Sequence, residues 1–250
     1  MRVFVTGASS GIGRALALHY GRRGAILGLA ARRKALLQTL IDELGNDRAV
    51  AYQVDVRDGT AMNEAARDFI ARHGVPDIVI ANAGISRGTL SDKAEDTEAF
   101  QAVIDINLVG LAKTFQPFIA PLRAAGGGKL VGIASVAGIR GLPGAGAYSA
   151  SKAGAINYLE SLRVELQGFG IEVVTVMPGF VDTPMTRANP YPMPFIINAE
   201  DAARRIARII AKGSRTAVVP WPMAIAARVL RWTPGWLYEV IATRAPRKPR

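Results

Sequence analysis

The chain alternates short, strongly apolar runs with longer segments of helical periodicity, and this alternation restricts the folds open to it. Seven apolar runs occur: RVFVT, AILGLA, AVAYQVDV, DIVIANAG, KLVGIAS, IEVVTVMPG and TAVVP. Runs that are apolar along their whole length are typical of parallel strands covered by helices on both faces. We therefore predict an α/β fold in which one doubly wound domain contains a parallel sheet of about seven strands flanked by helices.

Length and composition limit the possible functions. A chain of 250 residues that is 50% hydrophobic can bury one full α/β core. It has no cysteine and two widely separated histidines, so we expect no disulfide, no thiolate nucleophile and no metal site. An apolar run begins at Arg2, and no stretch of 18 uncharged apolar residues occurs. We therefore expect no signal peptide, no spanning helix and a cytoplasmic location.

The net charge of +11 is concentrated near the C-terminus. Residues 202–250 hold 11 basic side chains and one acidic side chain, whereas the preceding residues are nearly neutral. Proteins that bind nucleic acid usually carry a basic patch on their folded body. We therefore expect no nucleic-acid partner and treat the charge as a property of the tail.

The stretch FVTGASSGIGRALA, residues 4–17, has two readings. Gly7, Ser9 and Gly11 match the nucleophile elbow of serine hydrolases, while Gly7, Gly11 and Gly13 match a glycine-rich loop that opens a helix and binds phosphate. A serine nucleophile needs a histidine base, and no histidine follows residue 73. The sequence therefore favours the phosphate loop.

A second group of polar residues lies further along the chain. Tyr148 and Lys152 are four residues apart in a segment with helical periodicity from about Ser149 onward, so they share one helical face. An ammonium beside a phenol lowers the phenol pKa and makes tyrosine a usable general acid or base. Ser135 ends an apolar run before this helix, and Asn107 is a polar residue within an apolar helical segment.

Together these motifs resemble the short-chain dehydrogenase/reductase family, which has a Rossmann-like fold. The resemblance covers residues 2 to about 219 and rests on TGASSGIG at 6–13, ANAG at 81–84, Asn107, Ser135, Tyr148, Lys152 and PGFVDT at 178–183. Ala81 and Ala134 depart from the family pattern, but neither replaces a side chain with an expected chemical role.

The resemblance implies a role for each residue. Ser135 would hydrogen-bond a substrate carbonyl and Tyr148 would protonate it. Lys152 would lower the tyrosine pKa and hold the nicotinamide ribose, and Asn107 would anchor a water. The expected cofactor-binding residues are Gly7, Ser9, Ser10, Gly11, Ile12, Gly13, Arg32, Arg33, Asp55, Val56, Asn82, Ala83, Gly84, Tyr148, Lys152, Pro178, Gly179, Val181 and Thr183.

The end of the second apolar run indicates which nicotinamide cofactor is used. An acidic residue there would bind a ribose 2′-hydroxyl, but the sequence has Ala31 followed by Arg32, Arg33 and Lys34. Guanidinium groups suit a 2′-phosphate. We therefore expect NADP(H), and an enzyme that interconverts a carbonyl and an alcohol.

Apolar residues near the site suggest a lipophilic substrate. Residues 183–201 form a proline-rich excursion that we expect to act as a lid, with Met185 and Tyr191 among its substrate contacts. Ile139 and Leu142, between Ser135 and the helix, are also apolar.

The resemblance further implies a homodimer or homotetramer.

The C-terminal segment, residues 221–250, lies beyond the last expected strand. We treat it as a basic amphipathic extension of a dinucleotide-binding and catalytic domain at 1–220. All three tryptophans fall within it, and Trp232 shares a helical stripe with Ile225 and Val229. Peripheral contact with an anionic membrane and packing on the body or across a dimer are both open. An alternative function is a catalytically weak nucleotide sensor or membrane-surface protein on the same fold.

Overall fold

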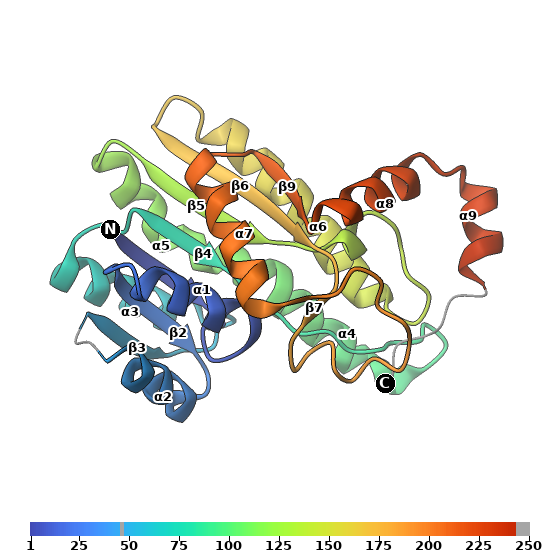
Figure 1. Cartoon of the computed structure of the whole chain (residues 1–250), viewed down its shortest axis with the longest axis horizontal. Coiled ribbons are helices and arrows are strands. Elements are labelled where there is room, and N and C mark those ends of the chain that lie inside the picture. The colour runs from blue at the N-terminus through green and yellow to red at the C-terminus, as the bar shows by residue number, and fades with distance from the viewer. Residues whose placement is uncertain (46–47, 244–250) are drawn as a thin grey trace.

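A seven-stranded parallel sheet forms the centre of the molecule (Figure 1). The computed structural model describes residues 1–45 and 48–243. The strands are β1 (Arg2–Thr6), β2 (Ile26–Ala31), β3 (Ala49–Gln53), β4 (Ile78–Ala81), β5 (Gly128–Ile133), β6 (Ile171–Pro178) and β9 (Thr216–Val219). They lie in the order β3-β2-β1-β4-β5-β6-β9, and every neighbouring pair is parallel. Each predicted apolar run overlaps one strand of the sheet, and the predicted fold class is confirmed.

Helices cover both faces of this sheet. The helices in the described part of the chain are α1 (Gly11–Gly21), α2 (Lys34–Leu44), α3 (Gly59–His73), α4 (Thr97–Ile104), α5 (Gly110–Ala124), α6 (Gly146–Glu165), α7 (Ala199–Lys212), α8 (Trp221–Trp232) and α9 (Gly235–Ala242). Helices α1, α2 and α7 pack on one face, and α3, α5 and α6 pack on the other. Helix α6 begins three residues earlier than we predicted from the sequence, which places Tyr148 within its first turn.

Alternation along the strands produces two separate cores. Val3 and Val5 of β1 belong to the core beneath α1, α2 and α7, whereas Phe4 points to the opposite face and packs against Phe69 and Phe118. Successive side chains of a strand point to opposite faces of a sheet. The apolar runs lack a polar face because both faces of the sheet are buried.

The segment before β5 is one long helical rod with a local irregularity. A 3-10 turn, η1 (Ala94–Asp96), leads into α4, and a π-helical turn, η2 (Asp105–Val109), joins α4 to α5. By length and composition this rod, Ala94–Ala124, could cross a membrane, with a mean hydropathy of 1.2. We did not anticipate this from the sequence because Asp105 and Lys113 interrupt its uncharged run. In the fold, its apolar side packs on the sheet through residues such as Phe115.

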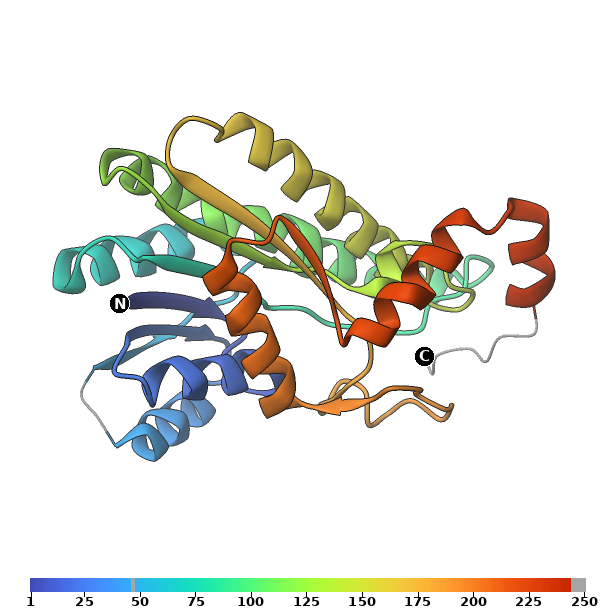
Figure 2. The same ribbon diagram turned by 45° about the horizontal axis from the view of Figure 1, so that its top comes forward.

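Two late segments of the chain lie beyond the carboxyl ends of the strands. After β6, the proline-rich excursion runs between two short parallel strands, β7 (Val181–Asp182) and β8 (Ile197–Asn198), before α7 begins. Helices α8 and α9 follow β9 and extend away from the sheet, as Figures 1 and 2 show from two directions. The proline-rich excursion and the C-terminal helices therefore lie at the same end of the molecule.

The tight packing under β2 gives a test of this core. A Cβ added to Gly28 would lie 2.9 Å from Phe4 Cε2 and from Phe69 Cδ2, and both rings are fully buried. We expect Gly28→Ala to lower the free energy of unfolding by about 1–3 kcal/mol because the rings must shift. Gly59→Ala is the control, since its nearest neighbour, Lys113 Cδ, is 3.7 Å away. Equal unfolding midpoints in urea for the two variants would contradict this packing.

Candidate active site

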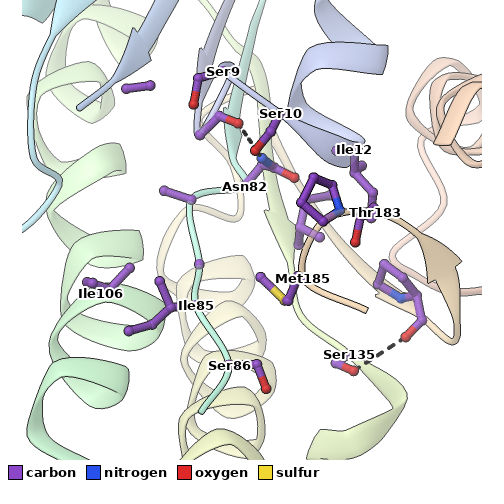
Figure 3. A pocket seen from close by; sticks show the side chains of 18 of the residues that line it. Ser9, Ser10, Ile12, Asn82, Ile85, Ser86, Ile106, Ser135, Thr183 and Met185 are labelled. Atoms are coloured by element: carbon purple, nitrogen blue, oxygen red, sulfur yellow. Dashed lines mark hydrogen bonds between the residues drawn. The ribbon is translucent and has the colours of Figure 1, made fainter. Parts of the chain in front are cut away.

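A cleft of about 530 Å³ opens at the carboxyl edge of the sheet and collects most of the residues singled out from the sequence. Figure 3 shows several of the side chains that line it, with Ser9 and Ser10 at one end and Ser135 toward the other. Of the expected site residues, those that line the cleft are Gly7, Ser9, Ser10, Gly11, Ile12, Arg32, Arg33, Asp55, Val56, Asn82, Ala83, Gly84, Ser135, Tyr148, Lys152, Pro178, Gly179, Val181 and Thr183. Gly13 and Asn107 are the two that do not line it.

The glycine-rich loop joins β1 to the N-terminus of α1. Gly7 has φ +67° and Gly11 has φ +55°, a left-handed conformation that glycine adopts without strain. A Cβ on Gly7 would lie 2.8 Å from Ala83 Cα, and one on Gly13 would overlap the Gly7 carbonyl. The absence of a side chain at Gly13 therefore lets the start of α1 pack closely against the Gly7 carbonyl. No side chain caps α1, so its first N–H groups remain available to an anionic ligand.

Arginine side chains lie along the same end of the cleft. Arg33 Nη2 donates hydrogen bonds to Ser9 Oγ at 3.0 Å and to Ser10 Oγ at 2.8 Å. The carboxylate of Asp55 accepts hydrogen bonds from Arg57, which holds the pKa of that carboxyl below its usual value, and Arg32 contributes to the same shift. This end of the cleft therefore combines positive charge with serine hydroxyl groups.

Ser135, Tyr148 and Lys152 come from two elements and meet in the cleft. Ser135 follows β5, its hydroxyl accepts a hydrogen bond from Ala137 N, and it hydrogen-bonds the side chain of Tyr148. Lys152 Nζ donates to the Ile133 carbonyl at 2.8 Å and lies 5.9 Å from the centroid of the Tyr148 ring. The predicted proximity of these three side chains is therefore present in the fold.

The pKa of Tyr148 differs from the sequence prediction. We expected Lys152 to lower it, but the pKa is raised because burial disfavours the phenolate, and this effect outweighs the hydrogen bond with Ser135. Tyr191, in the proline-rich excursion, adds to the rise. Burial also lowers the pKa of Lys152 from 10.5 to about 8. Desolvation is therefore the largest influence on the pKa of both groups.

Asn107 contacts the chain on both sides of its amide group. Its Oδ1 accepts from Ile85 N at 2.8 Å, and its Nδ2 donates to Ile85 O at 2.9 Å and to Ser151 Oγ at 3.0 Å. It lies in the π-helical turn, a feature that often occurs at functional sites. Asn107 therefore fixes the loop after β4 against α6, one turn from Tyr148.

Sequence reasoning missed several residues around the cleft. Ile85, Ser86, Arg87 and Ile106 line it, and Ser151 supports Asn107. The first three follow the ANAG motif directly, so extending that motif into the loop would have found them. Neither histidine lines the cleft, and the Ser9 hydroxyl accepts from Arg33, which removes the geometric basis for the hydrolase reading.

Comparison with known proteins identifies the family. A family model described as short chain dehydrogenase matches residues 1–192. The chain belongs to the short-chain dehydrogenase family. An uncharacterized oxidoreductase of Myxococcus xanthus is 39% identical over 242 residues, which cover 96% of this chain and 95% of that protein. A 3-oxoacyl-[acyl-carrier-protein] reductase of Thermotoga maritima is 35% identical and covers 74% of this chain and 76% of its own.

Solved structures of related proteins agree with this assignment. A 3-ketoacyl-ACP reductase from Sinorhizobium meliloti superimposes with a TM-score of 0.77 at 29% identity, covering 88% of this chain and 97% of its own. An alcohol dehydrogenase from Thermococcus sibiricus, solved in complex with 5-hydroxy-NADP, gives a TM-score of 0.77 at 26% identity. The superposition covers 87% of this chain and 95% of that protein. The protein is thus an oxidoreductase of the short-chain dehydrogenase family with a Rossmann-like fold.

The buried lysine gives a pH-dependent test. With its folded pKa lowered to about 8, Lys152 destabilises the fold fully below that pH, and the penalty disappears as pH rises toward 10.5, where the unfolded lysine also loses its proton. We expect Lys152→Met without cofactor to be more stable than wild type at pH 7 by about 1–3 kcal/mol, after loss of one hydrogen bond.

Urea unfolding at pH 7 and pH 10 measures this difference, which should shrink at the higher pH. The exposed Lys93→Met is the control and should show no such change. A stability difference for Lys152→Met that stays constant between the two pH values would contradict the role of burial.

Proposed function

We propose that the protein is an NADP(H)-dependent oxidoreductase that interconverts a carbonyl and an alcohol. The observation that carries this proposal is the convergence of Ser135, Tyr148 and Lys152 in one cleft with the glycine-rich loop. A site that only sensed a nucleotide would need the loop but not the acid–base group at the other end.

The cleft fits a dinucleotide along its length. The N-terminus of α1, which no side chain caps, would bind a pyrophosphate through its backbone N–H groups, and Gly7 and Gly11 of the loop line the cleft beside it. Arg32 and Arg33 would hold a 2′-phosphate, which supports NADP(H). Val181 and Thr183 also line the cleft, with Thr183 beside Gly11, and would contact the nicotinamide end of the cofactor. When bound, the nicotinamide supplies or accepts a hydride.

The chain itself supplies the proton. Ser135 would hydrogen-bond the substrate oxygen, and Tyr148 would donate a proton to it during reduction. The raised pKa of Tyr148 keeps its hydroxyl protonated at neutral pH, as a proton donor requires. Lys152 is held by the Ile133 carbonyl and lies near the tyrosine ring. When Tyr148 gives up its proton, the Lys152 ammonium would stabilise the phenolate and offset part of the cost of burying that charge. Asn107 positions the helix that carries both residues.

Apolar surroundings support a lipophilic substrate. Met185 of the lid lines the cleft, and Val136, next to Ser135, packs with Ile139 and Met223 in a small apolar cluster. The named relatives that reduce 3-oxoacyl groups on a carrier protein act on substrates of this kind. We therefore take 3-oxoacyl thioesters as the first substrate class to assay.

Replacement of Tyr148 tests the proton donor. Tyr148→Phe should lower reduction of the best 3-oxoacyl thioester or ketone at least 10²- to 10⁴-fold, roughly the contribution of positioned acid–base catalysis. NADPH affinity, measured by fluorescence titration, should change little. Tyr158→Phe on the same helix is the control, because that ring packs against the core and lies outside the cleft. Wild-type turnover by Tyr148→Phe would refute the proposal.

Replacement of Arg32 tests the cofactor preference. Arg32→Ala should weaken NADPH binding about 10- to 150-fold, the loss of a charged hydrogen bond, and leave NADH binding unchanged. Lys34→Ala is the control, since Lys34 is exposed and does not line the cleft. Isothermal titration with both cofactors makes the comparison. An equal loss for NADPH and NADH would show that Arg32 does not recognise the 2′-phosphate.

A further inference from the structure

Helices α8 and α9 present an apolar face that nothing in the described part of the chain covers. We call it the C-terminal apolar face, and its members are Trp221, Ile225, Val229, Trp232, Trp236 and Val240. Their exposed fractions lie between 56% for Val240 and 80% for Trp232. Within each helix these residues follow one another at intervals of three or four, so they share one side of that helix. An exposed apolar stripe of this kind marks an interaction site on a protein that is otherwise well packed.

This face does not serve to attach the helices to the body, because other side chains do that. Met223 and Ala227 on the inner side of α8 are buried against Val136. Arg140, in the loop after β5, donates hydrogen bonds to the Leu230 and Thr233 carbonyls at the end of α8. The helix is therefore anchored through its inner side, and its apolar outer side is held outward.

A second contact anchors α9 in the same way. The Tyr238 hydroxyl donates a hydrogen bond to the Gly141 carbonyl, and the Arg140 guanidinium lies 5.1 Å from the centre of the Tyr238 ring. Tyr238 thus fixes α9 to the loop that also holds α8. Trp236, two residues before it, is 70% exposed. In both helices the tryptophans are exposed, while the opposite side of the helix contacts the body of the protein.

Charge beside the face identifies the partner. Exposed Arg228 follows Ile225 by three residues and precedes Trp232 by four, so it neighbours both on the helix surface. Arg231 is also exposed, and residues 221–250 contain six basic side chains against the single acidic Glu239. A second copy of the chain would bring these like charges together. An anionic partner would be attracted by them.

We propose that the C-terminal apolar face binds the surface of a bilayer that contains anionic lipids. Tryptophan and arginine on short amphipathic helices are typical of segments that lie in the headgroup region. Helix α8 has 12 residues and α9 has eight. At about 1.5 Å per residue neither can cross a hydrocarbon core of about 30 Å. The protein therefore docks on one leaflet, with the carboxyl end of its sheet toward the membrane.

The tryptophans provide a direct measurement on the intact protein. All three lie in the C-terminal apolar face, so the whole tryptophan emission comes from it. Vesicles with phosphatidylglycerol should shift the emission to shorter wavelength, and lipids brominated on the acyl chains should quench it. Pure phosphatidylcholine vesicles should have a much smaller effect, and high salt should reverse the binding because it screens the arginines.

Matched variants separate the charge from the apolar contact. Arg228→Gln with Arg231→Gln should weaken vesicle partitioning about 30-fold, since each nearby cation strengthens it about fivefold. The control removes two charges from exposed positions on α3, Arg67→Gln with Arg72→Gln, and should bind like wild type. Trp232→Ser should weaken flotation with these vesicles, whereas Val164→Ser, which changes another exposed apolar residue, on α6, should not.

Two results would overturn the proposal. One is the absence of quenching by brominated phosphatidylglycerol vesicles for the wild-type protein, a measurement that requires no variant. The other is an emission shift that appears without lipid as protein concentration rises, together with a dimer in sedimentation that Trp232→Ser dissociates. That outcome would assign the face to contact between two copies of the chain.

Discussion

The parallel sheet buried on both faces is the constraint on which the site depends. Every strand must return to the same end through a covering helix, so all strands finish at one edge. Residues that are distant in sequence meet there: Gly7 after β1, Asn82 after β4, Ser135 after β5 and Pro178 at the end of β6. The chemistry is carried by residues just beyond the ladder, where backbone groups are no longer used in strand pairing.

The buried lysine at this edge lowers the stability of the fold. Lys152 is buried, and its Nζ donates to the Ile133 carbonyl, which does not neutralise the ammonium as a carboxylate would. The lowered pKa of Lys152 and the raised pKa of Tyr148 share one cause, the loss of water around both groups. The three hydrogen bonds of Asn107 are uncharged and hold the surrounding backbone in place. The charged residue is therefore supported by neutral contacts.

The strands and most of the site could be predicted from the sequence because each depends on local patterns. Apolar runs located every strand of the main sheet, although β3 ends at Gln53, before Asp55 turns into the cleft. Motif spacing located Ser135 and Tyr148. The pKa of Tyr148 could not be predicted, since it depends on how much protein surrounds the hydroxyl. The bonds of Arg33 to Ser9 and Ser10 join segments that share no sequence pattern.

The C-terminal helices show the same limit, and they connect the two proposals. The amphipathic pattern of α8 is equally consistent with packing on the body and with binding a membrane, and in the structure one side of the helix packs on the body while the other is exposed. Met223 packs beside Val136, the neighbour of Ser135, and would overlap a Cβ on Gly179 of the cleft. Trp221 and Trp232 point outward. If both proposals hold, the bilayer lies on the outer side of α8 and Ser135, the residue proposed to bind the substrate carbonyl, lies on its inner side. A lipophilic substrate dissolved in the bilayer would then be concentrated one helix away from the cleft.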